Sequence, residues 1–453
     1  MNVIKEWLGK LKNKQVPASS LAEHRRNEAM ELLGNAENSG KWIEISTHYN
    51  GFIREVAVRG LRDHPSPEAL VALIERLNDW VPQIRDLALE GLNHYLTPSR
   101  AQALLIALEP LIALAARRRA DHGPTLMAAR TVLQSPEIKA EVYANFLARQ
   151  GKAARYLFAL LLEKDSTPET LLRDALAHRE LTVRLAAVSA CQDLPAAQAS
   201  PLLLEALSRP GAKVRVCVLR ALLPLFDDPR PILCKALLDA SASIRSLARW
   251  AAARHDVDAN AILKKKLNQG IPTRKQDWLG VIGLATELNF PLDKLWLTEA
   301  MRSRYSTVRQ AAVRLLGDNQ LSELLGALDD PSDKVFYAAV AQLDKLSWAS
   351  VTPGSGAKLD RDWHELSTAR RQAILQLIPG WQQVAYLLER LATEPVAQAF
   401  WLRQVGMWCD RQYQIVDPVT SKAEREALAQ KLRNLAATGL IGSDSVARVA
   451  STG

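Results

Sequence analysis

Residues 80–92 read Trp80-Val81-Pro82-Gln83-Ile84-Arg85-Asp86-Leu87-Ala88-Leu89-Glu90-Gly91-Leu92, and altered copies of this stretch recur at steps of about thirty residues. Every copy places an arginine directly after an isoleucine or a valine, and these arginines are Arg54, Arg85, Arg184, Arg215, Arg245 and Arg309. They step by 31 (54 to 85), 31 (184 to 215) and 30 residues (215 to 245), while the gaps of 99 (85 to 184) and 64 (245 to 309) fit three and two periods. A fixed period in this range is typical of a solenoid, in which each repeat contacts only its neighbours.

A second signal shares this period and is offset from the first by about half of it. It is a capping residue followed by proline, a pair that favours the start of a helix. The side chain of the capping residue accepts a hydrogen bond from a main-chain N–H that has no partner inside the helix, and proline has no N–H that would need one. The copies are Ser66-Pro67, Thr97-Pro98, Ser135-Pro136, Thr167-Pro168, Ser200-Pro201 and Asp228-Pro229. No segment shows sustained two-residue alternation of apolar and polar residues, which would indicate strands. The sequence therefore predicts an all-α protein, an α-solenoid or superhelix of about 10–12 antiparallel helix pairs.

The pattern resembles the HEAT-repeat family, in particular its short bacterial repeats of the kind found in phycobilisome lyases. In that family an aspartate in the turn precedes the arginine of the second helix by six residues. Asp79 with Arg85 and Asp239 with Arg245 match in full, whereas Asp330 meets Phe336, and the remaining turn positions carry His48, His178, Arg209 and Ser303. The resemblance implies that the arginines are structural and link neighbouring turns, with ligand contact as the alternative. This ladder would comprise Asp79, Arg85, Arg184, Arg215, Asp239, Arg245 and Arg309.

The domain organisation follows the strength of the period. We expect N-terminal capping helices over residues 1–48, repeats over 49–345, a loop over 346–366 and divergent helical repeats or a cap over 367–453. The loop is expected because residues 347–356 are rich in Gly, Pro and Ser, which are typical of loops. A basic amphipathic stretch near Trp7 either covers the first repeat or lies on a membrane surface. Trp363, Trp381, Trp401 and Trp408 either fill the core of the terminal cap or form an exposed interface.

The composition favours a folded protein with a moderate basic excess. The 453 residues carry a net charge of +9 and a pI near 9.4, which favours acidic partners or nucleic acid, although scattered solvated cations are the alternative. The runs at residues 117–119 and 264–266 are three arginines and three lysines. Both are interpreted as solvated helix ends, with an acidic docking spot as the alternative.

No chemical motif stands out. The four cysteines form no CxxC pair, and the eight histidines form no HExxH. Phosphate-binding, dinucleotide-binding and nucleophile-elbow patterns are also missing, so we expect no enzyme activity, cofactor or metal. Without an apolar signal-peptide core or a run of ~18 apolar residues, we expect a cytoplasmic protein with no membrane span.

The best candidates for partner contacts lie five residues after each arginine, on the side of the second helix away from its apolar stripe. These positions carry Arg59, Glu90, Ser189, Arg220, Trp250 and Arg314. If the second helices form the concave face, three arginines and a tryptophan there would suit an acidic protein surface or a phosphate backbone.

Three functions remain open at this point. The leading one is a non-catalytic scaffold, adaptor or inhibitor, including an immunity-type protein, that holds a protein partner with an acidic patch. The second is nucleic-acid binding, since HEAT-like alkylpurine DNA glycosylases use a basic concave groove, but neither such a groove nor a catalytic aspartate can be transferred to this chain residue by residue. The third is a lyase or chaperone for a protein-bound cofactor, a role that short HEAT-like repeats also serve.

Overall fold

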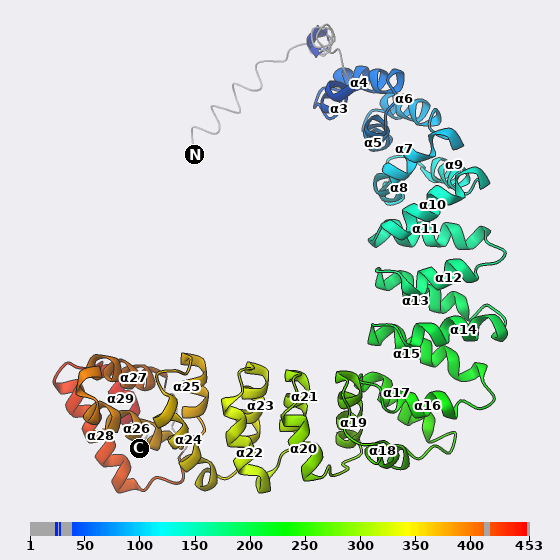
Figure 1. Cartoon of the computed structure of the whole chain (residues 1–453). Helices are drawn as coiled ribbons and strands as arrows, with labels where there is room; N and C mark the ends of the chain where they lie inside the picture. The colour runs from blue at the N-terminus through cyan, green and yellow to red at the C-terminus, as the bar shows by residue number, and fades with distance from the viewer. Residues whose placement is uncertain (1–22, 26, 29–38, 412–416, 451–453) are drawn as a thin grey trace. The chain divides into compact units, whose positions relative to one another are not determined.

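The regular structure of the chain is helical throughout its described residues (Figure 1). The computed structural model describes residues 23–25, 27–28, 39–411 and 417–450. No strand occurs within these ranges, which confirms the predicted all-α class. The amphipathic stretch around Trp7 lies outside them, so its two interpretations stay open.

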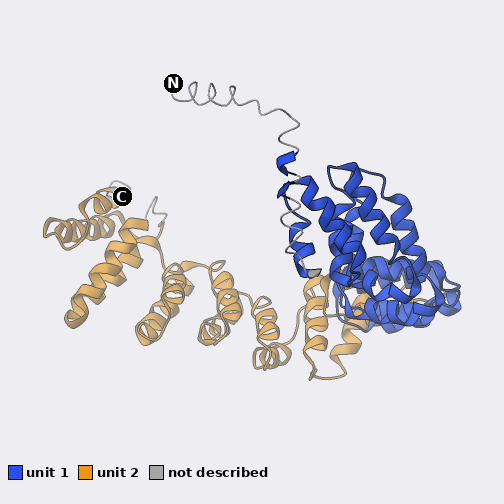
Figure 2. Ribbon diagram, turned by 90° about the horizontal axis from the view of Figure 1, so that it is seen from above, with its two compact units in different colours: residues 1–227 blue, residues 228–453 orange. Residues whose placement is uncertain are grey.

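The helices fall into two compact units, residues 1–227 and 228–453 (Figure 2). Unit 1 contains α3 Ser39–Ile45, α4 Gly51–Asp63, α5 Pro67–Arg76, α6 Pro82–Asn93, α7 Ala101–Ile106, α8 Leu108–Leu114, α9 Gly123–Leu133, α10 Lys139–Ala148, α11 Gly151–Lys164, α12 Glu169–Ala177, α13 Leu181–Cys191, α14 Ala196–Leu207 and α15 Ala212–Leu222. Unit 2 contains α16 Arg230–Ala236, α17 Ala242–Ala252, α18 Ala259–Leu267, α19 Lys275–Glu287, α20 Lys294–Met301, α21 Ser306–Val313, α22 Leu321–Gly326, α23 Asp333–Leu343, α24 Trp348–Asp362, α25 Thr368–Leu375, α26 Gly380–Thr393, α27 Gln398–Arg411, α28 Lys422–Ala437 and α29 Ser443–Ala450.

Within each unit the helices pack as consecutive pairs. In unit 1, for example, α12 packs on its partner α13, and each also contacts the equivalent helix of the next pair, α14 and α15. In unit 2, α21 packs on its partner α20 and on α23, the second helix of the following pair. A first helix thus lies against first helices and a second helix against second helices, which is the packing of a solenoid.

Helices begin within two residues of five of the six predicted capping residues, although Thr97, Ser135 and Thr167 make no side-chain cap bond. Ser66 caps α5, since its Oγ accepts a hydrogen bond from the N–H of Ala69 at 3.1 Å. The expected start at Ser200-Pro201 is wrong, because α14 begins at Ala196 and includes Pro201. Pro195 is the N-cap residue of this helix, and Pro201 lies inside it.

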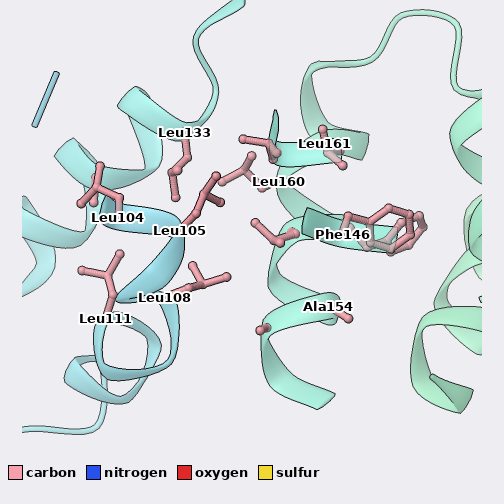
Figure 3. Packing of buried hydrophobic residues seen from close by; sticks show 14 of the residues in the cluster. Leu104, Leu105, Leu108, Leu111, Leu133, Phe146, Ala154, Leu160 and Leu161 are labelled. Carbon is pink, nitrogen blue, oxygen red and sulfur yellow. The ribbon is translucent and has the colours of Figure 1, made fainter. Parts of the chain in front are cut away.

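The degenerate region 100–160 retains the helix pairs. The short helices α7 and α8 together occupy the place of one first helix, and α9 packs on α7. Leu105 of α7 and Leu108 of α8 point toward Leu133 of α9 and Leu160 of α11 (Figure 3). The apolar core therefore continues through the region where the arginine motif is lost.

The predicted loop over residues 346–366 is wrong, since residues 348–362 form helix α24. Gly354 lies where α24 approaches α22, and a Cβ added to it would lie 2.3 Å from Leu325 Cδ1. The glycine therefore permits a close approach of the two helices and is not a sign of irregular backbone. The buried Lys358 pairs with Asp329 and with Asp362 and so fixes the same helix.

The C-terminal tryptophans are core residues. Trp363, Trp381, Trp401 and Trp408 are all at least nine-tenths buried, which confirms the cap interpretation over an exposed interface. Two of the four cysteines are buried as well, and desolvation raises the pKa of Cys191 to about 11. Such thiols are unreactive and contribute to packing.

Candidate functional site

The repeated arginines bind main-chain carbonyls of their own turns. Arg85 Nη1 donates to the carbonyl oxygen of Asp79 at 2.9 Å, six residues earlier in the chain. The same bond recurs from Arg54 to His48, Arg215 to Arg209, Arg245 to Asp239 and Arg309 to Ser303. Arg184 differs, since its Nη1 donates to Pro210 of the following turn at 3.0 Å. Each guanidinium thus replaces missing main-chain partners at the bend between two helices.

Arg54 and Arg309 also pair with the turn aspartate of the next repeat, and Arg245 pairs with Glu287 of α19. Arg54 Nε and Nη2 donate to Asp79 at 2.9 and 2.8 Å, and Arg309 makes the same bidentate pair with Asp330 at 2.6 and 2.8 Å. Burial raises the pKa of the Asp79 carboxyl, but the bonds from Arg54 and Val81 outweigh it and leave the pKa below its ordinary value. Each carboxylate therefore joins neighbouring repeats, and Arg85 in turn binds the carbonyl of Asp79.

The residue in the turn before each second helix varies between repeats, but in several repeats it accepts the same main-chain hydrogen bond. Asp79, Asp239 and Asp330 each accept a hydrogen bond from the amide two residues ahead, at 3.0, 2.7 and 2.8 Å. His48, His178 and Ser303 accept the equivalent bond through Nδ1 or Oγ. The acceptor holds the amide of the residue just before the second helix, and histidine and serine substitute for aspartate in this role, whereas Arg209 at the equivalent position has no acceptor group.

The repeat with Phe336 in place of arginine receives an arginine from its neighbour. Arg370 of α25 lies over the Phe336 ring, with its Cζ 4.6 Å from the ring centroid. Its Nη1 donates to the carbonyl of Asp330 at 2.9 Å, which is the bond that the missing arginine would have made. The ladder is therefore structural even where the sequence pattern fails.

The five charged or aromatic residues among the six candidate contact positions are all exposed, but their surroundings differ. Arg59 pairs with Glu55 at 2.9 Å, and Glu90 pairs with Arg62 at 3.2 Å. The ring of Trp250 is covered by Arg254, whose Cζ lies 3.7 Å from the ring centroid. Arg220 and Arg314 form no ion pair with any described carboxylate, so two of the five retain an uncompensated charge.

Arg314 also lines a groove between α21 and α23, the second helices of two consecutive pairs in unit 2. The groove has a volume of about 510 Å³. Arg314 lies on the α21 side, while α23 contributes Lys334, Tyr337, Ala341 and Lys345 at successive turns or just beyond its end. We call this surface the α21–α23 groove.

The charge of the α21–α23 groove is positive. Its three cations are Arg314, Lys334 and Lys345, and none of them pairs with a carboxylate in the described part of the chain. The single acidic residue of the lining, Asp333, is bound by Arg370 at 2.7 Å and does not neutralise them. An exposed Tyr337 lies among them and offers a flat ring with a polar end.

Sequence reasoning found Arg314 in this groove and missed the residues on α23. Ala341 lies five residues after Phe336, which stands where the other copies have arginine, and it lines the groove. Nothing in the sequence singles it out, because that copy lacks the arginine and an alanine side chain carries no chemical signal. Its small side chain leaves the space between the helices open. Lys334 and Lys345 lie one helical turn or more from Ala341 and therefore occupy no repeat position.

The two runs of cations are placed differently. The lysines at 264–266 form the last turn of α18, in agreement with a favourable position at the negative end of the helix dipole. In the arginine run, the Arg119 guanidinium donates to the carbonyl of Asn78 at 3.0 Å and stacks on Trp80 at 3.8 Å. The Arg119 side chain is therefore held by Asn78 and Trp80 of unit 1. It lies in the segment after α8 and not at the helix end that the sequence predicts for this run.

No known family model matches the chain, and a comparison with curated proteins gave no significant match. Among the described residues, no group of three or more His, Cys, Asp and Glu side chains is arranged to hold a metal ion. In the same part of the chain, no helix is both long and apolar enough to cross a bilayer.

Proposed function

We propose that this chain is a HEAT-like repeat protein that binds an acidic segment of another protein in the α21–α23 groove. In this role it acts as a scaffold, an adaptor or an inhibitor, including an immunity-type protein that neutralises its target. The observation that carries the proposal is the set of three cations around Tyr337 in one concave surface, none of which pairs with a carboxylate among the residues that the structure describes. The between-repeat pairs Arg54–Asp79 and Arg309–Asp330 support the HEAT-like assignment, because they are the structural ladder that the resemblance implies.

An acidic partner follows from the energetics of these cations. An exposed ion pair inside one chain contributes only about 0–1 kcal/mol. When a partner covers a groove and removes water, charge complementarity steers association and rejects wrong partners. Tyr337 adds a ring of the type enriched at the centre of protein interfaces.

A protein partner fits this groove better than duplex DNA does. Proteins that bind DNA firmly contact about 6–10 phosphates, whereas the groove offers three cations. Three phosphate contacts predict a log–log salt slope of about −3. We therefore expect random-sequence DNA to bind weakly, with a slope shallower than about −4.

The test is affinity purification from the native cells followed by titration of the identified protein. The variant Arg314→Glu/Lys345→Glu should weaken binding of that protein at least ~10-fold, a change equivalent to about 1.4 kcal/mol. The matched control Lys265→Glu/Lys294→Glu makes the same change in net charge on the first helices α18 and α20. The proposal fails if the partner binds the groove variant and the control equally well.

We also place the protein in a reducing cytoplasm, in agreement with its four free cysteines. Fractionation of the native cells that recovers the chain outside the cytoplasm would contradict this placement.

A further inference from the structure

A second concave site in unit 2 lies between α25, α26 and α27. It is a pocket with a volume of about 270 Å³, and its lining is separate from that of the α21–α23 groove. The second helices α25 and α27 form its sides, and α26 contributes Gln383 and Leu387. The site therefore does not depend on the function proposed above.

The walls of this pocket are aromatic and held in place. Trp408 lines it, and its Nε1 donates to Gln383 Oε1 at 3.0 Å. Gln383 in turn donates to the carbonyl of Ile378 at 2.8 Å, which fixes the orientation of its amide. Trp363, on the other side, packs against Trp401 with ring centroids 4.8 Å apart. Both indoles are buried in the core, so only a small part of each ring reaches the pocket, and that part needs little reorganisation on binding.

The charged groups of the pocket are cationic. Arg371 of α25 lies over the Trp363 ring at 5.4 Å and donates to Thr368 at 3.2 Å, and Arg411 is the last residue of α27. Neither arginine pairs with a carboxylate in the part of the chain that the structure describes, and the lining contains no Asp or Glu. The amides of Gln372 and Gln404 supply further donors from the same two helices.

We propose that this pocket binds a small aromatic carboxylate. The planar guanidinium groups suit the carboxylate, since arginine donates two parallel bonds to that group. The apolar lining, which includes Met407 and the accessible parts of the two indoles, suits a ring, and the volume limits the ligand to about one ring system. An uncharged aromatic would leave both arginines without a counter-charge.

The test uses the full chain and isothermal titration calorimetry. The probes are benzoate, phenylacetate and indole-3-acetate, each compared with its own neutral amide, and phenyl phosphate. At least one carboxylate should bind, and its amide should bind at least ~10-fold more weakly because the charge is lost. The proposal is overturned if no carboxylate binds better than its amide, or if phenyl phosphate binds more tightly than every carboxylate.

Two variants locate the binding. Arg411→Gln should weaken the best carboxylate about 10-fold or more without lowering the melting temperature, because Arg411 is exposed and makes no internal ion pair among the described residues. Arg403→Gln, an exposed position on the same helix outside the pocket, should leave the affinity unchanged. Equal affinities for the two variants would place the ligand elsewhere. Arg314→Glu/Lys345→Glu should leave carboxylate binding intact, so failure of one proposal is distinguishable from failure of the other.

Discussion

Arg54 shows how one residue joins two repeats. Its guanidinium is buried, binds two carbonyls of its own turn and forms a bidentate pair with the buried Asp79 of the next turn. A buried charge without its partner is costly, so the pair is held together by the penalty for breaking it.

We predict that Asp79→Ala lowers the free energy of unfolding by about 3–5 kcal/mol, because it leaves the buried Arg54 charge uncompensated. The control Glu55→Ala removes the exposed partner of Arg59 and should cost less than about 1 kcal/mol. Urea denaturation of both variants measures the difference. Similar losses in the two variants would mean that the Asp79 pair does not stabilise the stack.

The lowered pKa of Asp79 predicts a pH dependence. The unfolded chain binds a proton at this carboxyl near its ordinary pKa of about 3.9, while the folded chain does so only at lower pH. The stabilisation is therefore complete above about pH 5 and is lost as the pH falls through the folded-state pKa. The stability difference between the wild type and Asp79→Asn should shrink between pH 5 and 3 in denaturation curves. A constant difference over that range would contradict the assignment.

At the scale of the element, two misjudged segments show what the sequence leaves hidden. Residues 346–366 contain Gly, Pro and Ser and were expected to form a loop, but the glycine at 354 permits close contact with Leu325. Phe336 breaks the arginine motif, yet Arg370 from the next pair restores the bond. Local composition and spacing predict helix existence well because the period is local. They do not reveal side chains that are supplied from another repeat.

Helix α19 offers the sharpest test of close packing. A Cβ on Gly283 would lie 2.3 Å from the Arg245 guanidinium, which binds Glu287 at 2.6 Å and Asp239 at 2.7 Å. We predict that Gly283→Ala destabilises the protein by about 1–3 kcal/mol, as overpacking does. Gly406→Ala in α27, where no atom lies within 4 Å of an added Cβ, should instead stabilise by up to about 1 kcal/mol. Thermal denaturation compares the two, and the same sign for both would contradict the packing argument.

For the whole molecule, the sequence predicted the all-α solenoid but not its division into two units. The arginine motif continues from Arg215 to Arg245, across the boundary at residues 227 and 228, because the motif reports local packing. The candidate groove was found in part, through Arg314, and its remaining cations were missed since they follow no repeat position.

We predict that fragments 1–227 and 228–453 each fold alone. One continuous apolar core lies within residues 42–222 and another within 297–449. Each fragment should show a helical circular dichroism spectrum and a cooperative melt. A fragment that lacks helical signal while the full chain is folded would show that its core is not self-sufficient.

The central claim is that the repeated arginines build the stack and that variable residues beside them bind the partner. Arg309 of α21 and Arg314, directly after that helix, test it most directly. The measurement is the melting temperature and the partner affinity of the variants Arg309→Gln and Arg314→Glu. Arg309→Gln should lower the melting temperature by at least about 3 °C and leave the affinity within about twofold. Arg314→Glu should leave the melting temperature unchanged and weaken binding about 10-fold or more. The account is contradicted if Arg309→Gln abolishes binding at full stability, or if Arg314→Glu unfolds the protein while the affinity of the folded fraction is unchanged.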